Sequence, residues 1–258
     1  MRPAIVMPLH DPDGSMISHL ERITPLLKDV FAAAYLSLEP DAAGRYPERL
    51  LDLAGLARDN FFRLALLEAA LPVGDHFHAL YRFAASACPP DQVLHLCFPD
   101  RVSFALETSF KDAFLADVAA VEPGDTPMVF ERSPAAWQTH PQNYVEIEHF
   151  ATRMGELLLG KPWDFGWCHL ALTAGQLKAA LPCVRNHDLS MVAEILLLAQ
   201  PPARAKAVDW LAWEDPFLLG ADPQRLQDER QRSPEETRKR LSYILPIIQI
   251  LVEKSKIP

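Results

Sequence analysis

The sequence predicts an α/β protein, with a mixed but mostly parallel central sheet flanked by helices in a single domain. Two observations predict this fold class. The first 40 residues alternate as strand, helix and strand, which is typical of a βαβ unit and hence of a parallel sheet. The apolar runs that indicate strands are continuous rather than alternating, as expected for strands that helices cover on both faces.

The elements follow from apolar runs and from apolar residues that recur at helical spacing. Strands are predicted at 4–10, 32–40, 93–97 and 127–132. Helices are predicted at 16–31, 47–58, 76–87, 144–158 and 187–199, with a last helix from Ser233 onwards. The segment 60–71 is apolar on almost all sides, so a buried helix and a strand both remain open.

Capping patterns mark where three of the helices begin. Ser109 with Asp112 predicts an N-cap with an acid three residues later, and Thr173 with Gln176 predicts a second capping box. Ser233 precedes a proline and two glutamates, which is typical of a helix start. We expect that last helix to pack its Leu241, Ile244, Ile248 and Leu251 side against the domain or a second copy of the chain.

Composition narrows the functional classes. The 258 residues carry 25 basic and 34 acidic side chains, a net charge of −9, which disfavours nucleic acid as a partner. No segment is long and apolar enough to predict a membrane span or a signal peptide, so a cytoplasmic protein is expected. The four cysteines form no C-x-x-C pair, which disfavours a zinc knuckle or a redox dithiol.

Polar residues follow several of the predicted strands. In an open α/β sheet the carboxyl ends of parallel strands meet at one edge, and ligands bind there. The strand ends carry His10 with Asp11, Glu39, Asp100 with Arg101, and Glu131 with Arg132. For Asp100 two interpretations stand side by side, a ligand contact and a simple turn at a helix entry.

Four stretches resemble bacterial nucleotide-diphospho-sugar transferases of the GT-A type. The stretch LCFPDRVSFALE matches the position of their acidic strand-end motif and its final D-R pair, with Phe98 in place of the first acid. FERSPAAWQTHPQNYVEIE and HDLSMVAEI resemble two further segments of a bacterial branch of that group, and LAWEDP its late acidic segment.

The resemblance implies a GT-A-like, Rossmann-like domain over residues 1–222 and a helical extension over 223–258. It implies transfer of a sugar from a nucleotide diphosphate to a small-molecule or glycan acceptor. Asp100 would then be the metal contact for Mg²⁺ or Mn²⁺, and Arg101 the phosphate contact. Because Phe98 supplies no carboxylate, we expect the metal contribution to be weak.

The resemblance also implies roles for other residues. Pro8, His10 and Glu39 would lie near the nucleotide, and Arg82 would reach a phosphate or lie on a solvated helix face. Asp188 with His187 would accept the proton of the acceptor hydroxyl, although Asp188 also fits a helix cap. The remaining acceptor or sugar contacts would be Thr139, His140, Glu146, Asp164, Trp213 and Glu214.

Two functional hypotheses follow. The first is a glycosyltransferase, favoured by the pair Asp100 and Arg101, by the stretch Thr139-His140-Pro141 and by Asp188. The second is a GT-A-like protein that binds a nucleotide or a protein partner without transfer, favoured by Phe98 and by Glu131, which stands where the branch has glycine.

Overall fold

The computed structural model describes residues 2–10, 14–56, 60–124 and 126–255. The predicted strand-end residue Asp11 and the end of the predicted helix 47–58 lie outside these ranges. Within them, the strands are β1 (Ala4–Met7), β2 (Ala33–Leu38), β3 (Phe62–Leu66), β4 (Val93–Cys97), β5 (Met128–Arg132), β6 (His169–Thr173) and β7 (Arg204–Val208).

Helices connect these strands. They are α1 (Ser15–Val30), α2 (Glu48–Leu56), α3 (Val73–Ala87), α4 (Pro99–Glu107), α5 (Lys111–Ala119), α6 (Pro134–Gln138), α7 (Gln142–Leu159), α8 (Ala174–Ala180), α9 (Met191–Leu198), α10 (Asp215–Leu218), α11 (Pro223–Arg232) and α12 (Pro234–Lys254). Two short 3-10 helices, η1 (Leu181–Cys183) and η2 (Asp209–Leu211), follow α8 and β7. No described helix combines the length and apolar character needed to cross a membrane.

The strands form one mixed sheet in the order β3-β2-β1-β4-β6-β5-β7. β1 pairs in parallel with β2 and β4, and β2 with β3, whereas β6 runs antiparallel to both β4 and β5. The predicted α/β class is therefore confirmed, and the apolar runs at 4–10 and 93–97 supply two inner strands, β1 and β4. The undecided segment 60–71 contains a strand, β3, at the edge of the sheet.

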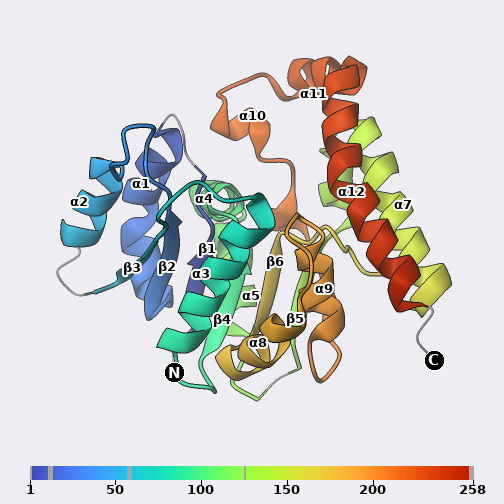
Figure 1. Cartoon of the computed structure of the whole chain (residues 1–258). Coiled ribbons are helices and arrows are strands. Elements are labelled where there is room, and N and C mark those ends of the chain that lie inside the picture. The colour runs from blue at the N-terminus through green and yellow to red at the C-terminus, as the bar shows by residue number, and fades with distance from the viewer. Residues whose placement is uncertain (1, 11–13, 57–59, 125, 256–258) are drawn as a thin grey trace.

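Both faces of the sheet are covered, as the continuous apolar runs predict. Along β1, Ala4 and Val6 face a core formed with α3, α8, α9 and α12, whereas Ile5 and Met7 face a core formed with α1, α2, α4 and α5. In Figure 1, α3, α8 and α9 lie on the near side of the sheet, and α7 and α12 lie side by side at its β5 end.

The C-terminal helix packs against the domain, and its packed side matches the predicted one in part, with Ile248 half-buried. Ile244 and Leu251 are buried as expected, whereas Leu241 is exposed, and Ile247 and Ile250 are buried in addition. The helix meets both α7 and α9, so its buried stripe is wider than contact with one partner would need.

Capping predictions have mixed outcomes. Thr173 forms the full capping box with Gln176, and the Ser233 hydroxyl accepts a hydrogen bond from the Glu236 N–H. Ser109 caps no helix, because α5 begins at Lys111 and its N-cap residue is Phe110, without a side-chain bond. The predicted helix 187–199 begins only at Met191, after a turn.

Two histidines on the neighbouring strands β4 and β6, His95 and His169, are buried in the interior of the domain. The His95 Nδ1 lies 2.7 Å from the His169 Nε2, and both rings are packed among Phe130 and other aromatic side chains. Burial lowers the pKa of His95 to about 3 and lowers that of His169 well below its ordinary value. The pair is therefore neutral at physiological pH.

This pair should make the fold sensitive to acid. The unfolded histidines bind protons below about pH 6.5 while the folded ones do not, so the stability of the fold should fall as pH drops from 6.5 towards 3. Each histidine contributes about 1.4 kcal/mol per pH unit in that window. Urea unfolding across this range should show that His95→Leu/His169→Leu flattens the pH slope by about two protons. A pH slope that the double substitution leaves unchanged would contradict this account.

Candidate functional site

The order of the strands creates a crevice at one edge of the sheet. The chain proceeds from β1 outwards to β3 and then returns to the other side of β1 with β4. The connections that follow β1 and β4 therefore diverge, and ligands in open α/β sheets bind at such a switch point. Because β6 is antiparallel, the loop before it lies at the same edge as the carboxyl ends of β4 and β5.

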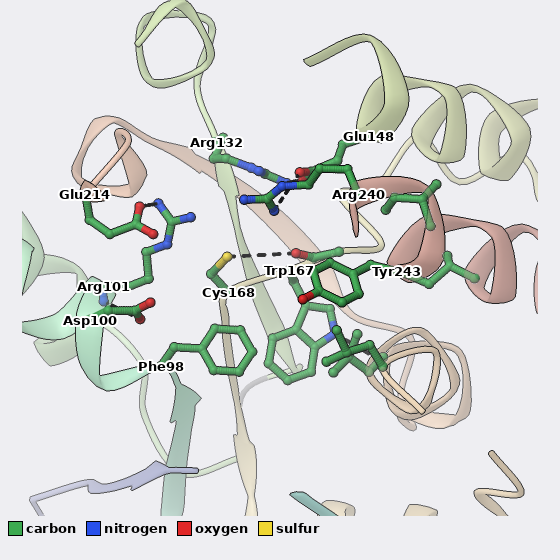
Figure 2. A pocket seen from close by; sticks show the side chains of 15 residues that line it. Phe98, Asp100, Arg101, Arg132, Glu148, Trp167, Cys168, Glu214, Arg240 and Tyr243 are labelled. Atoms are coloured by element: carbon green, nitrogen blue, oxygen red, sulfur yellow. Dashed lines mark hydrogen bonds and ion pairs between the residues drawn. The ribbon is translucent and has the colours of Figure 1, made fainter. Parts of the chain in front are cut away.

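Three hollows meet at this edge. The switch-point hollow, about 690 Å³, lies beside Pro8, His10, Glu39, His76, Phe98 and Asp100. The inner chamber, about 200 Å³, lies beneath α12 and is drawn in Figure 2. The outer cleft, about 390 Å³, lies beside His19, Asp215, Arg230 and Lys239. Asp100 and Tyr243 line all three, so the hollows form one continuous groove.

Glu39 is fixed in the switch-point hollow by a chain of hydrogen bonds. Its carboxylate lies 3.2 Å from the His76 Nδ1, accepts the Leu71 N–H at 3.2 Å and lies 3.6 Å from the His10 Nδ1. The other nitrogen of His76 bonds the Ser37 hydroxyl, which accepts the Leu9 N–H. Burial, partly offset by Glu39, lowers the pKa of His76. A neutral ring with its Nδ1–H towards Glu39 satisfies every member of this chain.

Arg132, at the end of β5, is the centre of a buried charge network beside the inner chamber. Its guanidinium donates two hydrogen bonds to Asp164, both 2.8 Å long, and lies 2.6 Å from a Glu148 oxygen. It also lies 3.6 Å from the centre of the Trp137 ring, a cation–π contact. Burial alone would raise the pKa of Glu148, but Arg132 and Arg240 hold it below its ordinary value.

A second buried pair, Arg101 with Glu214, lines the other side of the chamber (Figure 2). Arg101 also donates to the Ala212 carbonyl at 3.1 Å. Burial opposes the charge on Arg101, but the attraction of Glu214 raises its pKa above the ordinary value. Burial and the repulsion of Asp100 and Asp215 raise the pKa of Glu214, and the attraction of Arg101, at ion-pair distance, opposes that rise.

Asp100 lies in the first turn of α4, where the helix dipole favours an acid. Its Oδ1 accepts the Arg101 N–H at 2.7 Å. Burial is the largest influence on its carboxyl group and raises its pKa, despite the attraction of Arg101. Among the described residues it forms no ion pair, so this carboxylate faces the groove with capacity to bind.

The structure brings most of the predicted site residues to this edge. Pro8, His10, Glu39 and Asp100 share the switch-point hollow, and Asp100, Arg101 and Glu214 share the inner chamber. Asp164 is buried behind the chamber as the partner of Arg132. The side chain of Arg101 is engaged with Glu214, so its role as a phosphate contact remains a prediction.

The segment after β5 reaches the edge through backbone contacts. The Thr139 hydroxyl accepts the Trp213 N–H at 2.8 Å and donates to the Ala136 carbonyl. His140 is buried, bonds the same carbonyl through Nδ1, and has a strongly lowered pKa because of burial and nearby arginines. Thr139 and His140 thus hold this segment in place at the edge. Neither of them, nor Trp213, lines any of the three hollows.

Four predicted residues lie apart from the groove. Arg82 and Glu146 are exposed on α3 and α7, and Glu146 accepts a bond from Gln142. The His187 side chain is exposed and pairs with Asp75 at 2.5 Å, an interaction that raises its pKa. Asp188 is also exposed, in the turn before α9, where its Oδ1 accepts the Ser190 N–H. Asp188 therefore does not open the helix itself, and its placement gives the catalytic prediction no support.

Sequence reasoning missed three polar residues that line the chamber. Glu148, Arg240 and Tyr243 come from α7 and α12, far along the chain from the strand ends. A weak signal exists for Glu148, since it falls on the apolar side of an otherwise amphipathic helix, next to the buried Tyr144 and Ala151.

The donor set does not fit a metal ion held by the protein alone. Among the described ranges, no group of three or more His, Cys, Asp or Glu side chains is arranged to hold one. Asp100 supplies one carboxylate, Glu214 is engaged by Arg101, and Phe98 supplies none. A magnesium ion that enters with a diphosphate needs only one or two protein carboxylates, which Asp100 could provide.

Comparison with known proteins gives no functional assignment. No family model, no curated protein sequence and no solved structure matches the chain.

Removing the charge of Glu148 should destabilise the whole edge. Glu148→Gln removes the carboxylate partner of Arg240 and one of the two carboxylate partners of Arg132. Breaking a buried ion pair costs about 3–5 kcal/mol. Glu146→Gln, two residues away on the exposed side of the same helix, should change stability by less than about 0.5 kcal/mol. Chemical denaturation of both variants measures the difference. Equal effects would contradict the network described above.

Proposed function

We propose that the protein binds a nucleoside-diphosphate-linked sugar in the groove around Asp100 and transfers the sugar to an acceptor. The observation that carries this proposal is the convergence of three hollows on one carboxylate without an ion-pair partner among the described residues, at the switch point of the sheet. The resemblance of LCFPDR and of three further segments to GT-A transferases supports the same assignment.

The sizes of the hollows suggest how such a ligand is divided between them. The switch-point hollow offers room for a nucleoside, with the apolar side chains of Leu71, Phe77 and Phe98 beside the carboxylate of Glu39. The diphosphate would then pass Asp100, and the sugar would reach the inner chamber or the outer cleft. Asp100 is the proposed contact for a divalent cation that accompanies the diphosphate.

In the proposed reaction an acceptor hydroxyl forms a bond to the anomeric carbon as the bond from that carbon to the diphosphate breaks. The nucleoside diphosphate leaves with the electron pair, and the hydroxyl proton passes to a base. Carboxylates near the groove are suited to accept it, since a raised pKa makes a stronger base. Asp188 does not meet this requirement, because its side chain lies outside the three hollows.

A thermal-shift screen tests the binding step. UDP, GDP and other nucleoside diphosphates are added with and without Mg²⁺ or Mn²⁺. A ligand at 100 times its Kd stabilises the native state by about 2.7 kcal/mol, which corresponds to a rise of several degrees in Tm. Asp100→Asn should abolish the metal-dependent part, and Glu39→Gln should weaken binding regardless of metal. Asp112→Asn, at an exposed position on α5, is the matched control.

The outcomes separate the proposal from its alternative. Release of the nucleoside diphosphate from a nucleotide sugar, in the presence of acceptors, supports transfer. Binding without any release supports the second hypothesis, a nucleotide-binding protein that has lost transfer. If no nucleoside diphosphate changes the melting temperature, with or without metal, the proposal is wrong.

A further inference from the structure

The inner chamber is small and differs in character from the hollow beside it. Its volume of about 200 Å³ leaves room for one small ring with its substituents rather than for a nucleotide. It lies between the strand ends of the sheet and α12, and Phe98 and Asp100 stand between it and the larger switch-point hollow.

Aromatic side chains form one wall of the chamber. Figure 2 shows Phe98, Trp167 and Tyr243 gathered on the side opposite the arginines. Trp167 is fully buried, and its Nε1–H donates to the Val192 carbonyl at 2.8 Å, which fixes the plane of the indole. Such a wall offers a rigid apolar surface to the C–H face of a ring.

Three guanidinium groups line the rest of the chamber, and each has a carboxylate partner. Arg101 is paired with Glu214, and Arg132 is held by Asp164 and Glu148. Both are almost completely buried. Their positive charge is therefore compensated by protein carboxylates.

Arg240 differs from the other two arginines in its hydrogen bonding. Its guanidinium reaches from α12 over the chamber in Figure 2 and lies 4.0 Å from the centre of the Tyr144 ring. Its carboxylate contact, at 3.2 Å, is Glu148, an acid that it shares with Arg132. Its Nε is buried without a hydrogen-bond partner among the described residues, although a guanidinium has five N–H donors. Arg240 therefore keeps unused hydrogen-bonding capacity at the chamber.

We infer that the inner chamber binds a single sugar-sized ring that carries an anionic group, with the ring against Phe98 and Tyr243 and the anionic group at Arg240. This inference rests on the proposed function, which it narrows to transfer of, or to, an acidic sugar. A carboxylate and a phosphate both supply the anionic oxygen atoms that Arg240 would bind.

The experiment measures binding of free monosaccharides, without a nucleotide, by isothermal titration at matched ionic strength. Glucuronate and glucose 6-phosphate represent the two sources of the anionic group. Glucose is the neutral control, and inorganic phosphate is the control without a ring. One or both acidic sugars should bind at least about tenfold more tightly than glucose and than phosphate.

Arg240→Gln should remove this preference, so that the acidic sugar binds no more tightly than glucose. Arg238→Gln, which removes the same charge from an exposed position two residues away on α12, should keep it. Arg240→Lys keeps the positive charge but loses the planar fork, so it should retain part of the preference. Melting curves of the variants report whether α12 stays packed.

Three results would overturn the inference. They are equal affinity for glucose and the acidic sugars, binding of phosphate alone as tight as that of glucose 6-phosphate, and a preference that survives in Arg240→Gln. Absence of binding by every probe would also overturn it. Since none of these ligands contains a nucleotide, such a failure leaves the nucleoside-diphosphate screen as a separate test of the proposed function.

Discussion

The buried guanidinium of Arg132 is the constraint on which the arrangement of this edge depends. Removing a charged group from water costs several kcal/mol, and the cost is offset only when well-placed partners satisfy it. Arg132 obtains these partners from three separate segments: Asp164 before β6, Glu148 on α7 and Trp137 on α6. The charge thus holds together segments that come from different parts of the chain.

The same network extends to the C-terminal helix and thereby to the groove. Glu148 also receives Arg240, so α12 is joined to the strand ends by charge as well as by its buried isoleucines. Packing of α7 against the loop before β6 is close, since a Cβ at Gly155 would lie 2.1 Å from the Phe165 ring. These contacts place α12 beside the chamber, which its Arg240, Tyr243, Ile244 and Ile247 line.

The sequence predicts the parts of this structure that depend on local patterns. Continuous apolar runs predict β1, β2 and β4, and since parallel strands end at one edge, they also predict that His10, Glu39 and Asp100 lie there. The same patterns do not predict β6 and β7. The run that forms β6 contains the buried His169, and β7 is a short edge strand of exposed arginine, lysine and alanine. The Arg132–Glu148–Arg240 network is also not predicted, because no local pattern links residues so far apart in the chain.

Hydrogen–deuterium exchange of Arg132→Lys tests the central claim, that one buried guanidinium organises this edge. Lysine keeps the charge, but it cannot donate the two parallel hydrogen bonds to Asp164 or stack on Trp137 as arginine does. We expect faster exchange in residues 163–168 and in the first turns of α7 and α12, with β1 and β2 unchanged. Exchange that rises equally throughout the sheet, or that stays unchanged at residues 163–168, would contradict the claim.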